Sequence, residues 1–158
     1  MNIPSSLLRI AALLLLLVAV FTAPAVAADA QAEIRVLFAE YLRLHAAKEM
    51  LAWKDLFLPE ALCVRTGADG RVEVYTNIRE FAAGIAETAK TLQSQHETFE
   101  EVKIAVDGDA GTYATLYSLY HNGKKLQQGR AYFSLLRREG KWLIAALVWY
   151  KQDWKPSP

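Results

Sequence analysis

The stretch TYATLYSLYHNGKKLQQGRAYFSLLR (residues 112–137) carries the clearest structural signal in this chain. Its Asn122-Gly123 pair is the strongest hairpin-turn signal in the sequence, because both residue types tolerate the positive φ angles of a tight two-residue turn. The runs on either side are rich in aromatic and β-branched residues, which is typical of strands. We therefore predict a long antiparallel hairpin with strands at residues 112–121 and 124–137.

The register of this hairpin follows by counting outward from a two-residue turn. Period-two alternation then assigns the side chains to two faces. The first face is polar and aromatic, and its expected pairs are Tyr113 with Tyr132, Thr115 with Arg130, and Tyr117 with Gln128. The second face is mainly apolar. Two arrangements stay open: the polar-aromatic face lines a pocket, or the apolar face forms the core and the tyrosines lie outside.

The sequence on both sides of this hairpin predicts the rest of the domain. Apolar residues at helical spacing indicate helices, Asp69-Gly70 indicates a second hairpin, and Glu80 matches the capping-box spacing from Asn77. We expect helices at residues 32–50, 51–58 and 78–92, and strands at residues 61–65, 71–75, 98–106 and 142–150. This order specifies an α+β domain, in which a strongly bent antiparallel sheet wraps around three helices as a cone with one open end.

The first 28 residues have the three parts of a secretory signal peptide. They contain one positive charge at Arg9, an apolar run over residues 10–21, and small residues after Pro24. That run is shorter than the roughly 20 residues that a membrane-spanning helix needs. We therefore predict that residues 1–28 are removed on export. Residues 29–158 would then form a single periplasmic or secreted domain with no membrane attachment.

Composition disfavours several classes of function for this domain. Only Arg9 among the 18 basic residues lies in residues 1–28, so 17 basic side chains remain against 17 acidic ones. A neutral domain has no net field that attracts nucleic acid, and we expect no such partner. Cys63 is the single cysteine, and we interpret it as a buried, unreactive thiol. The histidines lack metal-ligand spacing and no Gly-rich phosphate loop is present, so no metal or cofactor is expected.

Three short motifs stand out by their order and spacing: DLFLPEA (residues 55–61), NIREF (residues 77–81) and GKWLIA (residues 140–145). Together they resemble the nuclear transport factor 2-like superfamily, which includes SnoaL-like and ketosteroid isomerase-like proteins. Residues 97–124 also resemble a lumazine-binding-like branch without an established activity. The resemblance covers nearly all of residues 29–158 and implies the cone-shaped fold. Because this fold hosts isomerases, dehydratases, ligand binders and interaction modules, it implies no single function.

Ketosteroid isomerases allow a comparison residue by residue. In the register of this resemblance, Tyr41 matches their oxyanion-binding tyrosine and Trp149 matches a pocket-lining aromatic residue. Their catalytic aspartate matches Arg65, which accepts no proton at ordinary pH. Their second oxyanion donor matches Tyr132, which retains a hydroxyl. The resemblance thus implies a pocket that has lost its catalytic base, and steroid-type isomerisation is not expected.

These arguments define a candidate ligand pocket. His45 lies four residues after Tyr41, so both project from one side of the first helix, where an ordinary core role for the histidine is the alternative. Arg130 needs an acidic partner or an anionic ligand if it faces inward, and its candidate partners are Glu80, Glu87 and Glu97. The candidate pocket residues are Tyr41, His45, Tyr113, Tyr117, Gln128, Arg130, Tyr132 and Trp149. We expect the side chains from the helix, from the two hairpin strands and from the last strand to converge on one cavity.

Three functions remain as alternatives. The first is an exported module that binds a small, partly aromatic or carbonyl-bearing molecule without converting it. The second is an isomerase- or dehydratase-type enzyme with His45 as general base and Tyr41 as hydrogen-bond donor, and the loss of a carboxylate base disfavours it. The third is a protein-interaction module. Apolar and aromatic residues on both strand faces also predict a homodimer through the outer face of the sheet.

Overall fold

The chain forms an α+β domain, which confirms the expected fold class. The computed structural model describes residues 28–66 and 71–152. A long N-terminal helix spans residues 28–47. The other helical segments are α2 (Met50–Trp53), the short 3-10 helix η1 (Lys54–Leu56) and α3 (Ile78–Lys90). The strands are β1 (Phe57–Thr66), β2 (Val72–Tyr75), β3 (Gln95–Asp107), β4 (Ala110–His121), β5 (Lys124–Arg138) and β6 (Lys141–Gln152).

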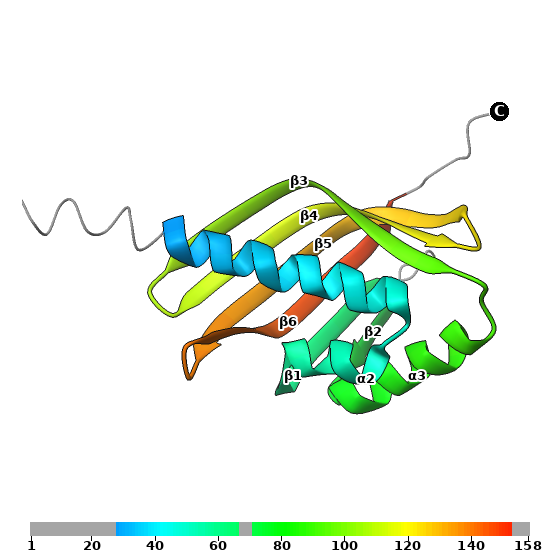
Figure 1. Cartoon of the computed structure of the whole chain (residues 1–158), viewed down its shortest axis with the longest axis horizontal. Helices are drawn as coiled ribbons and strands as arrows, with labels where there is room; N and C mark the ends of the chain where they lie inside the picture. The colour runs from blue at the N-terminus through cyan, green and yellow to red at the C-terminus, as the bar shows by residue number, and fades with distance from the viewer. Residues whose placement is uncertain (1–27, 67–70, 153–158) are drawn as a thin grey trace, which may run out of the picture.

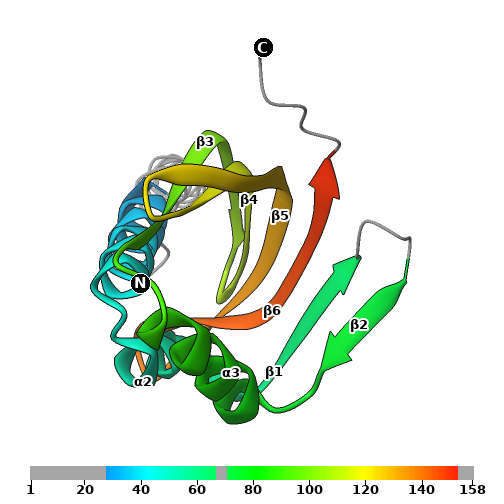
Figure 2. The same cartoon turned by 90° about the vertical axis from the view of Figure 1, so that its right-hand side faces the viewer.

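The strands form one six-stranded sheet in the order β2-β1-β6-β5-β4-β3. All neighbouring strands are antiparallel except β1 and β6, which are parallel, so the sheet is mixed. The N-terminal helix lies across the concave side of β3 to β6, and α2 and α3 lie together at one end (Figure 1). Figure 2 shows how strongly the sheet curls around these helices, as expected for a cone.

Local sequence signals account for several of these boundaries. Asn122 and Gly123 have φ angles of 50° and 74°, as the predicted tight turn between β4 and β5 requires. The side chain of Asn77 caps α3 by accepting hydrogen bonds from the backbone N–H groups of Arg79 and Glu80. Its amide also donates to the Glu80 carboxylate at 2.9 Å, so the predicted capping arrangement is confirmed.

The second predicted helix is wrong over its last residues. Helical structure ends at Leu56, and β1 begins at Phe57, upstream of Pro59. Proline has no backbone N–H to donate, and the pairing of β1 with β6 is irregular between Phe57 and Leu62, where Pro59 lies. The irregular pairing accommodates the proline inside a strand instead of placing it at a helix end.

The predicted register of the β4–β5 hairpin is also wrong beyond the turn. His121 pairs with Lys124 as expected, but Leu119 pairs with Gln127 while Tyr120 pairs with Lys125. Leu126 is therefore an extra residue in β5, which is a β-bulge. Because one added residue reverses the alternation of a strand, every later residue of β5 faces the opposite side from the one predicted.

The core lies between the N-terminal helix and the concave face of the sheet. Phe38 of the helix is buried and stacks on Tyr113 of β4, with ring centroids 3.6 Å apart. At the same end of the domain, Glu33 accepts hydrogen bonds from Trp142 Nε1 and Arg137 Nη2, both at 3.0 Å. These contacts attach the helix to the β5–β6 turn and fix its direction across the sheet.

The predictions on export, membrane attachment and metal binding can be compared with the described residues alone. The predicted signal peptide lies outside the described residues except for Ala28. Within residues 28–66 and 71–152, no helix has both the length and the apolar character needed to span a membrane. In the same ranges, no cluster of three histidine, cysteine or acidic residues is arranged to hold a metal ion.

Candidate functional site

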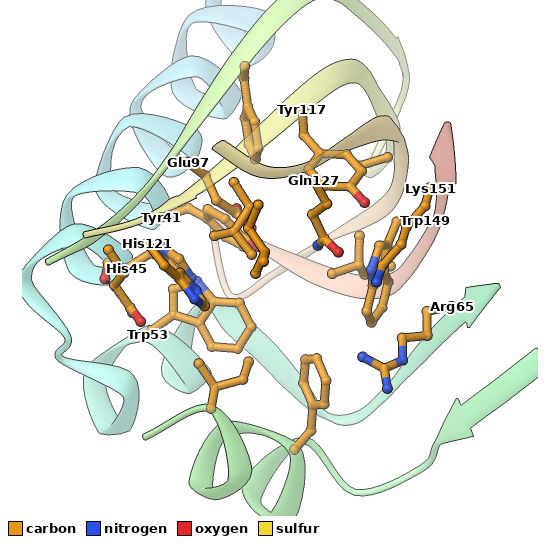
Figure 3. A pocket seen from close by; sticks show the side chains of 18 of the residues that line it. Tyr41, His45, Trp53, Arg65, Glu97, Tyr117, His121, Gln127, Trp149 and Lys151 are labelled. Atoms are coloured by element: carbon orange, nitrogen blue, oxygen red, sulfur yellow. Dashed lines mark hydrogen bonds between the residues drawn. The ribbon is translucent and has the colours of Figure 1, made fainter. Parts of the chain in front are cut away.

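A pocket with a volume of about 300 Å³ opens between the concave face of the sheet, the C-terminal half of the N-terminal helix, and α3. Its wall combines aromatic and aliphatic side chains with several polar ones, and such a mixed lining can bind a small molecule and orient it. The aromatic lining residues are Tyr41, Trp53, Phe81, Phe99, Tyr117, Phe133 and Trp149. Figure 3 shows the labelled side chains arranged around this space.

The N-terminal helix contributes Tyr41 and His45, which lie one helical turn apart as predicted. The Tyr41 ring is held by Trp53 at 5.1 Å and Phe133 at 5.7 Å between ring centroids. The backbone carbonyl of His45 accepts a 2.8 Å hydrogen bond from Gln95 Nε2, which attaches the start of β3 to the end of the helix. The Tyr41 ring and the backbone of His45 are therefore fixed in place.

Glu97 of β3 is the one acidic side chain among the described residues that line the pocket. Burial raises its pKa above the ordinary glutamate value, while the charge of His45 and a hydrogen bond from Tyr41 act in the opposite direction. Burial also raises the pKa of Tyr41 well above its usual value, and the negative charge of Glu97 adds to this effect. A carboxyl group, a phenol and an imidazole thus meet in one water-poor environment, where proton transfer is chemically feasible.

Three side chains of the pocket wall have buried polar atoms without a hydrogen-bond partner. They are His45 Nδ1, Trp53 Nε1 and the Tyr117 hydroxyl. These residues are 5%, 1% and 3% exposed, so bulk water does not replace the missing partners. An unpaired buried polar group costs about 1–3 kcal/mol. Three such groups around one cavity therefore favour a ligand whose polar atoms supply the missing hydrogen bonds.

The opposite side of the pocket is basic (Figure 3). Parallel pairing of β1 with β6 sets Arg65 beside Trp149, and Lys151 follows two residues later on the same face. Arg65 donates through Nε and Nη2 to the Glu73 carboxylate at 2.7 and 2.6 Å. Trp149 packs against Phe81 of α3 with ring centroids 5.8 Å apart. This side therefore combines a flat aromatic surface with two cationic groups.

The structure brings half of the predicted pocket residues together. Tyr41, His45, Tyr117 and Trp149 line the pocket. Tyr113 faces the same side of the sheet but lies deeper, in the core against Phe38.

Gln128, Arg130 and Tyr132 lie on the outer face of the sheet, so their predicted convergence on the cavity is wrong. The bulge at Leu126 is the reason, because it turns Gly129, Ala131 and Phe133 inward in their place. Arg130 instead binds Glu101, at 2.5 Å between Nη2 and Oε2, and not one of the three expected glutamates. Neither predicted arrangement of the two faces is therefore correct as a whole.

Glu97 is the functional candidate that the sequence reasoning missed as a pocket residue. It lies two residues before the apolar Phe99, so strand alternation from Phe99 places it on the inner face. The surrounding polar sequence, residues 93–97, concealed this signal because it is typical of a loop. Lys151 follows Trp149 by two residues, so alternation also places it on the inner face, but the predicted strand ended at residue 150. Trp53 had no comparable signal, since its place in the pocket depends on how α2 packs.

Comparison with known proteins assigns this chain to a family. The model of the SnoaL-like domain matches residues 26–148. This chain belongs to the SnoaL-like domain family. The predicted superfamily is thereby confirmed, while the narrower likeness to a lumazine-binding-like branch stays a prediction. A search of curated proteins found no match to this chain.

Solved structures of this fold agree with the assignment. A nuclear transport factor 2-like protein with a cystatin-like fold from Novosphingobium aromaticivorans is 17% identical, with a TM-score of 0.67 over 95% of this chain and 92% of that one. A nuclear transport factor 2-like protein of unknown function from Pseudomonas putida is 13% identical, with a TM-score of 0.70 over 82% of this chain and 98% of that one. At these identities the likeness shows the fold, and the SnoaL-like family supports a small-molecule-binding or isomerase-type module.

Proposed function

We propose that this SnoaL-like protein is an exported module that binds a small aromatic molecule carrying polar groups and releases it unchanged. The observation that supports this most directly is the aromatic pocket with unpaired polar atoms on Trp53, His45 and Tyr117. A flat ligand would stack against the rings of the wall. Its oxygen or nitrogen atoms would supply the missing hydrogen bonds, each of which strengthens binding because the protein partner is already buried and fixed.

The test is calorimetric binding of a neutral bicyclic probe, 2-naphthol, to the purified protein. Thr88 is an exposed residue of α3 at the pocket, so Thr88→Trp should fill the entrance without disturbing the core. Ala83→Trp is the matched control, because Ala83 is exposed on the same helix and does not line the pocket. We expect binding to the wild type and to Ala83→Trp, with loss of binding in Thr88→Trp. Absence of binding to the wild type, or equal binding to both variants, would contradict the proposal.

A second function is favoured by one observation, the position of Glu97 beside Tyr41 and His45. The sequence had suggested that no carboxylate base was present, but Glu97 could remove a proton from the carbon next to a ligand carbonyl and return it to another carbon. Tyr41 would donate a hydrogen bond to the oxyanion formed on the carbonyl oxygen. Such a reaction is an isomerisation, because the proton removed from one carbon is returned to another, and it consumes no oxidant.

Exchange of carbon-bound protons for deuterium separates these two functions. The probe is 2-tetralone, an aromatic ketone, incubated with the protein in D₂O and followed by NMR. An enzyme should accelerate exchange at the carbon next to the carbonyl, and Glu97→Gln should remove the acceleration while 2-tetralone still binds. Binding of 2-tetralone without accelerated exchange would support the non-catalytic module.

A further inference from the structure

The charges around the pocket are unevenly distributed. Arg65 and Lys151 lie on one side, together with Trp149, whereas His45, His121 and Trp53 lie on the other (Figure 3). Because β1 and β6 are neighbours in the sheet, the two basic side chains extend from adjacent strands toward the same opening. We call this pair, Arg65 and Lys151, the basic rim.

The two members of the basic rim differ in how they are held. Arg65 is fixed by its ion pair with Glu73 and by the Tyr75 ring, 5.9 Å from its guanidinium carbon. The Tyr75 hydroxyl also donates to Glu73 at 2.5 Å, which spreads the negative charge of that carboxylate over two partners. Lys151 has no acidic partner within the described residues and is exposed. The rim therefore retains an uncompensated positive charge.

The other side of the pocket is unsuited to a charged ligand group. Trp53 Nε1 and His45 Nδ1 are buried without a hydrogen-bond partner, and both atoms suit a hydroxyl group on the ligand. Burial lowers the pKa of His121, with a contribution from the charge of His45, so this imidazole favours its neutral form. The nearby Glu97 carboxylate would repel an anion placed there. The basic rim is consequently the more favourable place for a negative group on the ligand.

We propose that the pocket selects aromatic carboxylates, with the carboxylate bound between Arg65 and Lys151 and the ring against Trp149. A hydroxyl or carbonyl group at the far end of the ring system meets Trp53 and His45. This proposal rests on the proposed function and adds the chemical class of the ligand and its orientation. A carboxylate suits the rim because the planar guanidinium of Arg65 and the mobile ammonium of Lys151 both donate charge-assisted hydrogen bonds.

The experiment compares two probes of the same size, 2-naphthoate and its neutral amide, naphthalene-2-carboxamide, by calorimetry. We expect the wild type to bind 2-naphthoate about tenfold more tightly than the amide. Lys151→Gln should weaken naphthoate binding by about fivefold and leave amide binding unchanged. Added salt should weaken binding of the anion only, because screening acts on charge pairs.

Lys141→Gln is the matched control, since Lys141 is an exposed lysine at the other end of the same strand and does not line the pocket. It should leave the preference for naphthoate intact. Equal binding of both probes to the wild type would overturn the inference and leave the proposed function standing. Equal losses in both lysine variants would also overturn it, because net charge and not the rim would then explain the preference. Failure of both probes to bind would overturn the proposed function and this inference with it.

Discussion

The Tyr117 hydroxyl shows how a single residue links stability to binding. It is buried at the pocket wall without a hydrogen-bond partner. Tyr117→Phe removes the unpaired group and keeps the ring, so we expect the free energy of unfolding to stay constant or rise by up to about 1 kcal/mol. Affinity for 2-naphthol should fall in the same variant, because the hydroxyl is then absent from the pocket.

Urea denaturation and calorimetry measure these two effects. Tyr113→Phe is the control, because Tyr113 lies on the same strand face but in the core and outside the pocket. It should not change the affinity. A loss of stability in Tyr117→Phe would show that its hydroxyl has a structural partner, contrary to our interpretation.

Glu97 predicts a pH dependence of stability. Because burial raises its pKa in the folded state, the folded protein binds more protons than the unfolded chain between the ordinary and the raised pKa. Stability is therefore highest below the ordinary glutamate pKa and falls as the pH rises through the raised value. Glu97→Gln should lack this fall, so its stability relative to the wild type increases with pH.

Thermal unfolding measured from acid to neutral pH tests this dependence. Glu87→Gln is a suitable control, because Glu87 is exposed on α3 and pairs only with Lys90 on the surface. It should follow the pH profile of the wild type. Parallel profiles of Glu97→Gln and the wild type would contradict the assignment of the fall to Glu97.

At the level of elements, β5 and β6 approach each other closely at Gly129. A Cβ atom added there would collide with the backbone carbonyl of Tyr150 on the neighbouring strand. We expect Gly129→Ala to lower the free energy of unfolding by about 3 kcal/mol, since the obstacle is backbone and the strands must separate. Gly84→Ala in α3 should instead raise it by about 0.5–1 kcal/mol, because its added Cβ meets no atom and alanine favours the helix.

Chemical denaturation of the two glycine variants gives both values. Equal stability of Gly129→Ala and the wild type would mean that β5 and β6 can separate at little cost.

At the level of the whole molecule, we propose that the protein forms a homodimer through the outer face of its sheet. Tyr132, Val148 and Tyr150 are 46%, 44% and 37% exposed on adjacent strands of that face, and the two tyrosine rings lie 6.5 Å apart. Val74 of β2 extends the same apolar surface. Soluble monomers rarely expose a large continuous apolar surface.

Sedimentation at micromolar concentration should give a dimer for the wild type and a monomer for Val148→Lys. The control is Leu51→Lys, which places the same charge at an exposed leucine of α2, away from the sheet. It should remain dimeric. A wild type that sediments as a monomer would overturn the proposed interface.

Export is a separate prediction, since it concerns residues 1–28. N-terminal sequencing of the protein from the cell envelope or medium should begin at Ala28 or Asp29, because the small residues before them favour cleavage. Recovery of exported protein that still begins with Met1 would show that the segment is not a cleaved signal.

The sequence by itself determined the elements whose causes are local. The turn at Asn122-Gly123, the cap at Asn77 and the helical spacing of Tyr41 and His45 depend only on nearby residues. The family and the α+β fold followed from the order of these elements. For the turn, the cap and the helical spacing, the physical cause acts between residues close in the chain, so the printed sequence contains it.

Only the tertiary structure decided which strand residues enter the pocket. The bulge at Leu126 has no strong local signal, yet it moved Arg130 from the expected inner face to Glu101 on the outer face. Curling of the sheet brought Glu97 of β3 and Lys151 of β6, which lie on strands that are not neighbours, to the same pocket. Strand register is a long-range property, because it is set by which register buries the most apolar surface against the helix, and alternation converts a single inserted residue into a different site.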